Sequence, residues 1–322
     1  MKLLRRNIIQ IIDFTHEHIE QAQKLAQQNY EEERYFVPAL PSVDSFPDLS
    51  GFAENGLGVA AFEGKRMIGY LCSVSPFQNA FGGSDAVGIF SPMGANGAAE
   101  ENRANIYARM YQAAGTKWAK AGASSHAVCL YAHDRFAQEQ FFKYGFGLRC
   151  IDATLSIDEI VASPCEGYNF TEFARAESSK INGLRNLLTN HMKKSPCFIN
   201  RNEQDVLDII SHRDMRIFTV TDSCKPIGFI EIMTNGENFA CDASDMMNIC
   251  GAYLLPEYRG KDIFTGLLYY VINTLNSEGY HRLGVNFESI NPTAYGFWLK
   301  HFNAYTHSVV RRIDERAIKV AL

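Results

Sequence analysis

The sequence lacks long apolar runs, closely spaced cysteine pairs and an excess of basic residues. No apolar run reaches the roughly 18 residues that a membrane-spanning helix requires, and the basic start of the chain is not followed by the apolar segment of a secretory signal. The 8 cysteines include no Cys-x-x-Cys pair, which argues against a zinc or dithiol motif. The net charge of −5 gives no reason to expect nucleic-acid binding. We therefore expect a cytoplasmic protein with reduced thiols, no metal, and neither nucleic acid nor membrane among its partners.

What the sequence does contain is an ordinary globular balance, with 46% hydrophobic and 21% charged residues over 322 positions. This length is about twice that of a usual domain. Two hairpin-like phrases place Gly69 and Gly228 at a separation of 159 residues. The ends of two amphipathic stretches place Gly122 and Gly279 at a separation of 157 residues. Anchors that keep their order at a near-constant offset indicate two copies of one fold.

Both copies have the same predicted order of elements: strand, helix, hairpin, strand, helix, strand, helix and closing strand. This order predicts the α+β class, with a mixed, mostly antiparallel sheet flanked by helices in each copy. The copies are predicted to join near residues 161–164. The sequence thus predicts an N-terminal domain of residues 1–162 and a C-terminal domain of residues 163–322.

A short basic loop in the second copy carries the clearest chemical signal. A hydrophobic strand stops at Pro256, the run Arg259-Gly260-Lys261 follows, and an amphipathic helix begins immediately afterwards. Backbone N–H groups at a helix start form an anion site. Two cationic side chains add charge, and glycine allows a close backbone approach. The loop predicts a phosphate or pyrophosphate site; the alternative is an ordinary turn with solvated basic residues.

The residues around this loop resemble the signature of the GNAT acetyltransferase superfamily, in which Gln/Arg-x-x-Gly-x-Gly/Ala follows the fourth strand. Arg259 fills the first position, whereas Asp262 and Phe264 replace the two glycines. The segment 291–300 resembles the family's Asn-x-x-Ala-x-x-Leu-Tyr-x-Lys helix, and the first copy has its own version of that helix. The resemblance covers residues 7–315 and implies a tandem acetyltransferase with two GNAT-like domains.

The resemblance also implies that acetyl-CoA is the cosubstrate and that backbone amides of the loop hold its pyrophosphate. The residues that it implies for cofactor binding are Ala252, Leu254, Arg259, Gly260, Lys261, Asp262, Ile263, Phe264, Asn291, Ala294 and Trp298.

The two copies differ at this loop. Pro92 and Gly122 are 30 residues apart in the first copy. Their expected counterparts, Pro256 and Gly279, are only 23 residues apart. We therefore expect seven extra residues at the cofactor loop of the first copy, where a pair of glutamates replaces the basic run. The N-terminal domain is predicted to be degenerate for the cofactor; alternatively, its glycine-rich loop forms a wall of the substrate cleft.

Acetyl transfer to an amine needs a base, stabilisation of the developing oxyanion, and a protonated or tolerated thiolate. Glu231 and Glu288 lie on predicted strands and are candidates for the base. Relatives place a tyrosine on the last helix as the acid, but Trp298 fills that position here, so Tyr295, three residues earlier, is the substitute candidate. For the two glutamates the alternatives are recognition of a cationic substrate or a salt bridge. The arginines considered for that bridge are Arg282, Arg311 and Arg312.

The resulting hypothesis is an acetyl-CoA-dependent N-acetyltransferase that acts on a primary amine of a small molecule or peptide as a monomer or homodimer. One alternative is an acyl-CoA-binding regulatory protein or pseudo-enzyme, and another is a tandem acetyltransferase similar to mycothiol synthase. The acceptor is not identified, because acceptor pockets are built by loops that the fold does not fix.

Overall fold

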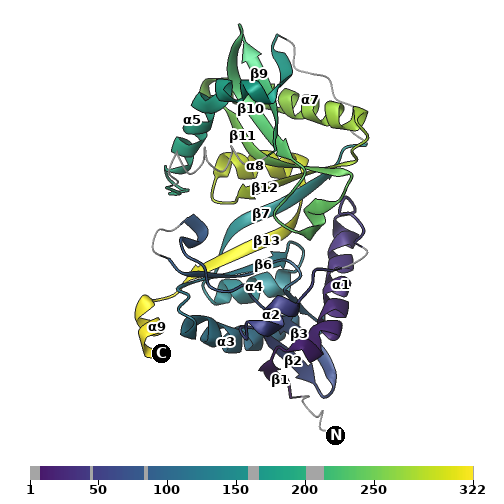
Figure 1. Cartoon of the computed structure of the whole chain (residues 1–322), viewed down its shortest axis with the longest axis vertical. Helices are drawn as coiled ribbons and strands as arrows, with labels where there is room; N and C mark the ends of the chain where they lie inside the picture. The colour runs from purple at the N-terminus through teal and green to yellow at the C-terminus, as the bar shows by residue number, and fades with distance from the viewer. Residues whose placement is uncertain (1–7, 44–45, 83–85, 159–166, 201–213, 322) are drawn as a thin grey trace. The chain divides into compact units, whose positions relative to one another are not determined.

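The computed structural model describes residues 8–43, 46–82, 86–158, 167–200 and 214–321. Within them the chain forms two compact units (Figure 1). Unit 1 comprises Met1–Ile151 and Ala304–Leu322, and unit 2 comprises Asp152–Asn303. The junction expected between residues 162 and 163 lies outside the described residues.

The helices and strands of unit 1 follow the predicted order. They are β1 (Gln10–Asp13), α1 (Ile19–Phe36), α2 (Ser50–Glu54), β2 (Val59–Glu63), β3 (Arg66–Leu71), β4 (Gly88–Ser91), β5 (Asn96–Ala98), α3 (Arg103–Lys120), β6 (Ser125–Tyr131), α4 (Arg135–Lys143), β7 (Gly147–Ser156), β13 (Asn303–Arg312) and α9 (Glu315–Ala321). Strands β1, β2, β3 and β5 form an antiparallel sheet. Strand β4 runs parallel to β6, which pairs antiparallel with β13.

Unit 2 repeats this arrangement. Its elements are β8 (Asn169–Phe173), α5 (Asn182–Met192), β9 (Arg216–Asp222), β10 (Lys225–Met233), β11 (Met246–Leu254), α7 (Ile263–Ser277), β12 (Arg282–Glu288) and α8 (Pro292–His301). Strands β8 to β11 are antiparallel neighbours, and β11 runs parallel to β12. The α+β class with mixed, mostly antiparallel sheets and flanking helices is confirmed.

The two closing strands, β7 and β13, are divided between the units in a way that does not follow the order of the sequence. Residues from Ala304 onward in β13 belong to unit 1, although they come last in the chain. Asp152 and the rest of β7 belong to unit 2, where Asn286 of β12 donates a hydrogen bond of 2.6 Å to the Asp152 carboxylate. Each unit therefore takes strand residues from the other half of the sequence.

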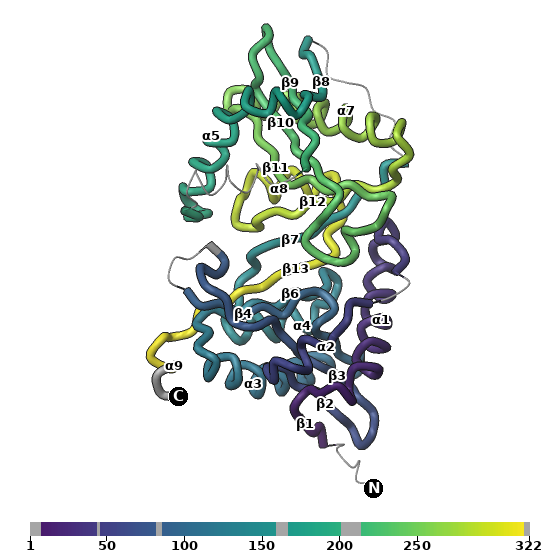
Figure 2. Tube along the Cα trace, in the orientation of Figure 1, coloured from purple at the N-terminus to yellow at the C-terminus, as the bar shows by residue number. Residues whose placement is uncertain are grey.

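Alternation along the strands places helices on opposite faces of the sheet in unit 1 (Figure 2). Buried residues of α1 pack against Ala60, Phe62 and Tyr70. Buried residues of α3 pack against the intervening positions, such as Ala61 and Ile68. In unit 2 the same alternation directs α5 and α7 to opposite faces of β9. Two amphipathic helices and one sheet thus make two thin apolar layers in each unit.

The strand registers align the two copies residue by residue. The β2–β3 hairpin closes with Glu63 opposite Arg66, and the β9–β10 hairpin closes with Asp222 opposite Lys225. Both pairs are offset by 159 positions. Farther along these hairpins, β5 and the end of β11 occupy matching places.

The expected insertion at the cofactor loop of the first copy is wrong. Four residues connect β5 to α3, whereas eight connect β11 to α7, so this loop is shorter in unit 1. The extra residues lie elsewhere, because β4 and β5 are separated by a four-residue interruption, and α3 has 18 residues to the 15 of α7. Counting from Pro92 failed because this proline lies in that interruption and does not correspond to Pro256.

His126, on β6 of unit 1, makes the stability of the fold dependent on pH. Its ring nitrogens lie 2.9 Å from the Tyr111 hydroxyl and 3.1 Å from the Ala123 carbonyl. Burial lowers the pKa of His126 to about 4, and the charge of Arg311 contributes. Because the unfolded chain takes up this proton near pH 6.5, the stability is present above that pH and is lost as the pH falls toward 4.

We therefore expect the free energy of unfolding to fall by about 2 kcal/mol between pH 7 and pH 5 on account of this one residue. Urea unfolding at several pH values measures the slope, and His126→Gln supplies the reference without the titrating ring. Equal slopes for the two proteins would contradict the assignment.

Among the described residues, no helix is both long and apolar enough to cross a membrane.

Candidate functional site

Unit 2 contains a cavity of about 350 Å³ between the end of β11, the loop that follows it, and helices α5, α7 and α8. This volume is at the lower end of the range for small-molecule sites, about 300–1,000 Å³. Ten of the eleven residues implied for cofactor binding line it: Ala252, Leu254, Arg259, Gly260, Asp262, Ile263, Phe264, Asn291, Ala294 and Trp298. The fold thus brings together residues spread over 47 positions of the sequence, and their role toward a cofactor stays a prediction.

The first turn of α7 opens onto one part of this cavity. Asp262 precedes the helix with a φ of +55°, a left-handed conformation that aspartate tolerates better than most residues. Its side chain does not cap the helix. Gly260, with a φ of +73°, permits the tight path of the loop. The helix start therefore presents backbone N–H groups and a positive dipole end to the cavity.

The basic loop is anchored to the strands beside it. Arg259 donates a hydrogen bond from Nε to the Leu254 carbonyl at 3.0 Å, and its guanidinium lies 5.2 Å from the centre of the Tyr253 ring. The Lys261 ammonium lies 5.7 Å from the centre of the Tyr258 ring. Lys261 is the one implied residue that does not line the cavity. Of the two basic side chains of this loop, Arg259 is thus the one that is fixed at the cavity wall.

Helix α8 and its N-cap form another wall, with two aromatic residues and three polar ones. Asn291 caps the helix and its Oδ1 accepts from the Thr293 backbone N–H at 3.3 Å and from the Thr293 hydroxyl at 2.7 Å. Phe264 of α7 packs against the rings of Phe297 and Trp298, with centroid distances of 4.9 and 6.0 Å. The bulky residue in the glycine position is therefore accommodated by α8, whose aromatic side chains line the cavity.

Glu231 on β10 does not line the cavity but forms a buried ion pair. Its Oε1 accepts from Nε of Arg185 on α5 at 2.9 Å, and Arg185 Nη2 contacts the same oxygen. A Cβ at Gly251 would lie 2.5 Å from the other carboxylate oxygen, so glycine on β11 makes room for this group. Burial raises the pKa of Glu231, and the Arg185 guanidinium opposes that rise. The partner is none of the three arginines that the sequence suggested.

The other two catalytic candidates also lie outside the cavity lining. Glu288 is half-buried at the end of β12. Tyr295 on α8 is 43% exposed. Their neighbours do line the cavity: Asn291 lies between Glu288 and Tyr295 in the sequence, and Phe297 follows Tyr295 on α8. The catalytic roles of Glu231, Glu288 and Tyr295 therefore stay predictions.

Several lining residues were not predicted from the sequence. They are Leu188, His191, Tyr253, Tyr258, Thr265, Thr293, Phe297 and Lys300. Thr293, Phe297 and Lys300 lie in a segment that the sequence had already singled out. Leu188 and His191 lie on α5, about 100 positions before Asn291, and no local pattern connects the two segments.

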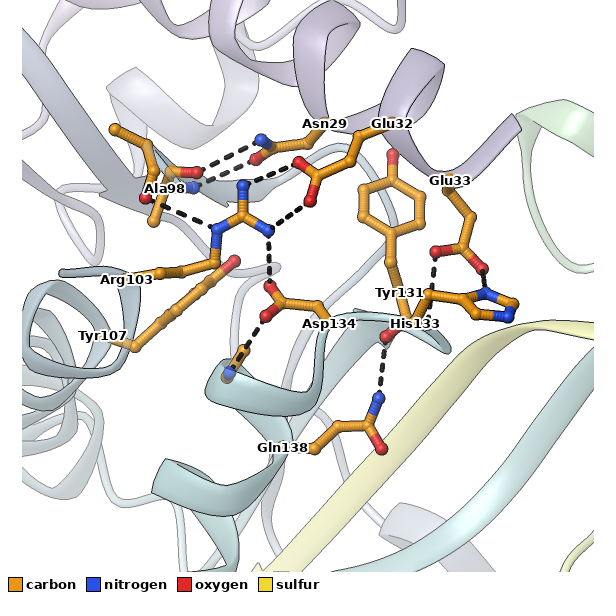
Figure 3. A network of polar contacts seen from close by, with 12 residues as sticks. Asn29, Glu32, Glu33, Ala98, Arg103, Tyr107, Tyr131, His133, Asp134 and Gln138 are labelled. Atoms are coloured by element: carbon orange, nitrogen blue, oxygen red, sulfur yellow. Dashed lines mark hydrogen bonds and ion pairs between the residues drawn. The ribbon is translucent and has the colours of Figure 1, made fainter. Parts of the chain in front are cut away.

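In unit 1 the corresponding place is closed by ion pairs (Figure 3). At the offsets set by the strand registers and helix caps, Glu32 matches His191 and Asp134 matches Asn291. Arg103, at the start of α3, is 6% exposed and donates to both oxygens of Glu32 at 2.9 and 2.7 Å.

Asp134 completes this network. It lies 3.5 Å from Arg103 and caps α4 by accepting from the Ala137 N–H at 3.0 Å. Burial raises the pKa of Asp134, and the neighbouring Arg103 opposes that rise. The guanidinium therefore ties together α1, α3 and α4, whose counterparts in unit 2 surround the cavity.

Of the residues that the structure describes, no group of three or more His, Cys, Asp or Glu side chains is placed to hold a metal ion.

Residues 186–303, which contain the whole cavity lining, match the sequence family described as Acetyltransferase (GNAT) family. No curated protein sequence matches the chain. Among solved structures, the chain is similar to a GCN5-related N-acetyltransferase from Sphaerobacter thermophilus, with a TM-score of 0.59, 10% identity, and coverage of 94% of this chain and 95% of that one. It is also similar to a GCN5-related glucosamine N-acetyltransferase region of a fungal multi-domain GH3 β-N-acetylglucosaminidase, with a TM-score of 0.52, 10% identity, and coverage of 95% of this chain and 38% of that one. At these identities the likeness shows the fold.

Proposed function

We propose that the chain, whose residues 186–303 match the GNAT acetyltransferase family, moves an acetyl group from acetyl-CoA to a primary amine of a small molecule or peptide. The proposed cofactor site is the cavity of unit 2. One observation supports this proposal. Ten of the eleven residues that the family resemblance implies for cofactor binding line this one cavity.

The residues present fit acetyl-CoA at both chemical ends. The α7 backbone amides and Arg259 supply positive charge for a pyrophosphate. The apolar and aromatic walls, including Phe264 and Trp298, suit the uncharged pantetheine arm, and Asn291 supplies a polar contact. When bound, acetyl-CoA supplies an activated acyl group, and the protein contributes binding, orientation and the exclusion of water.

The Glu32–Arg103–Asp134 network supports a division of labour between the copies. A pyrophosphate at the start of α3 would have to compete with two carboxylates for one guanidinium. We infer that unit 1 holds no acetyl-CoA and that the N-terminal copy is degenerate for the cofactor.

An acyl-CoA-binding regulatory protein is the second candidate. The observation in its favour is Trp298, which stands where relatives place the acidic tyrosine, while Tyr295 is exposed and does not line the cavity. Assays of CoA release with a panel of primary amines separate the two functions, because the regulatory protein would bind acetyl-CoA without turnover.

Arg259→Glu is the variant that tests the cofactor site. Charge-assisted hydrogen bonds are worth about 1.5–3 kcal/mol, and the reversal adds repulsion beside the phosphates, so we expect acetyl-CoA to bind at least about tenfold more weakly. Calorimetry measures the dissociation constant, and circular dichroism verifies the fold.

Lys261→Glu is the matched control, because it makes the same charge change two positions away, on a side chain that does not line the cavity. We expect Lys261→Glu to weaken acetyl-CoA binding less than Arg259→Glu does. Equal affinities for wild type and Arg259→Glu, with the fold intact, would contradict the proposed site.

A further inference from the structure

We propose that His191 is the general base that takes the proton from the acceptor amine. This inference rests on the proposed function. It assigns the removal of the amine proton to a side chain that lines the cavity, which neither Glu231 nor Glu288 does. His191 lies in the last turn of α5, is half-buried, and lines the cavity.

The hydrogen bonds around Asn291 determine which nitrogen of His191 carries the proton. Asn291 Oδ1 accepts from two donors of Thr293 and also lies 3.2 Å from His191 Nε2. Since this oxygen can only accept, Nε2 must donate to it. The lone pair of the neutral imidazole is then on Nδ1, and no hydrogen bond to that atom comes from the part of the chain that the structure describes. Asn291 thus fixes the tautomer and leaves a basic nitrogen available.

The other titratable or charged groups of the cavity lining are unsuited to this role. They are Tyr253, Tyr258, Arg259, Asp262 and Lys300, from β11, the loop and α8. A phenol, an ammonium and a guanidinium offer N–H or O–H donors and no basic nitrogen lone pair, so these four groups are not built to take the proton of an amine. Asp262 lies at the start of α7, which the proposed function assigns to the pyrophosphate. His191 is the lining side chain that combines an available basic nitrogen lone pair with a place outside the proposed pyrophosphate site.

The comparison between the copies supports the same assignment. Glu32 occupies the matching position on α1, but both of its oxygens accept from Arg103 (Figure 3). In unit 1 the group at this position is therefore neutralised and tied to the start of the next helix. In unit 2 this position is His191, which contacts the neutral Asn291 instead of a cation and lines the cavity. The group that lines the described cavity is therefore the one that is not paired with a cation.

The chemical step balances with this residue alone. The amine nitrogen forms a bond to the acetyl carbonyl carbon, and the carbon–sulfur bond breaks. His191 Nδ1 takes one proton from the amine nitrogen and afterwards releases it to solvent. The thiolate that leaves takes a proton from water, so the products are the N-acetylated amine and CoA in its thiol form.

His191→Gln is the discriminating variant. The glutamine amide keeps a donor for Asn291 Oδ1 but has no basic nitrogen. General-base assistance is worth about 10²–10⁴-fold, and we expect kcat/KM to fall by that factor. The readout is CoA thiol release from acetyl-CoA, with a polyamine, an aminoglycoside, an amino acid and a short peptide as acceptors, and with water alone. The dissociation constant of CoA should change less than threefold.

The dependence on pH separates a base from a residue that only positions Asn291. The wild-type kcat/KM should decline at acidic pH as His191 becomes protonated, and His191→Gln should lack that decline. A glutamine variant that stays within threefold of wild type would overturn the assignment. So would a wild-type protein that binds acetyl-CoA but releases CoA no faster than buffer does. A protein that binds no acetyl-CoA would instead contradict the proposed function itself, and the base assignment with it.

Discussion

Arg103→Met is expected to lower the free energy of unfolding by about 3 kcal/mol, because it leaves Asp134 buried without its cation. The side chains of Arg103 and Asp134 are only 6% and 9% exposed, so solvent does not readily replace the contact that Asp134 loses. Glu32 is more accessible, with 42% of its side chain exposed, which places the expected loss at the lower end of the range for buried pairs. Equilibrium unfolding in urea measures the change.

The matched control for this prediction removes every charge of the network. The triple variant Glu32→Gln, Arg103→Met, Asp134→Asn has no unpaired ion, and asparagine retains the helix cap that Asn291 provides in unit 2. We expect it to recover most of the lost stability. A triple variant no more stable than Arg103→Met would mean that packing of the arginine, rather than its charge, closes this part of unit 1.

Arg185→Met should have an even larger effect on unit 2, about 3–5 kcal/mol, because both members of the Arg185–Glu231 pair are about 95% buried. The variant would leave a carboxylate in an apolar environment where burial already raises its pKa. The double variant Arg185→Met, Glu231→Leu removes both ions and should be more stable than the single one. A single variant within 1 kcal/mol of wild type would show that the pair contributes little to the fold.

Glu231→Gln tests whether Glu231 has a catalytic role in addition to its ion pair with Arg185. If Glu231 serves the fold through Arg185, kcat/KM per folded molecule should stay within threefold of wild type. A loss of 10²-fold or more, at unchanged CoA affinity, would restore Glu231 as the base.

The sequence was sufficient for the features that depend on local patterns. Hairpin glycines and amphipathic stretches predicted the order of elements in both copies. The basic loop predicted an anion site at the start of a helix, because helix starts are coded by a few neighbouring residues. The ten cavity residues followed from the family resemblance of that loop and of the segment 291–300.

What the sequence could not predict depends on contacts between distant residues. His191 meets Asn291 across 100 positions, and Arg185 meets Glu231 across 46. Neither pair has a spacing that helix or strand periodicity would reveal. The predicted length of the corresponding loop in the first copy was wrong for the same reason. Only strand pairing shows that Pro92 lies in the interruption between β4 and β5.

Titration of acetyl-CoA into the full chain by calorimetry tests the central claim most directly. We predict one binding site per chain, at least about tenfold weaker in Arg259→Glu and unchanged in Arg103→Met at a temperature where that variant is folded. Two sites per chain, or one site that Arg259→Glu leaves intact, would contradict the placement of the cofactor in unit 2.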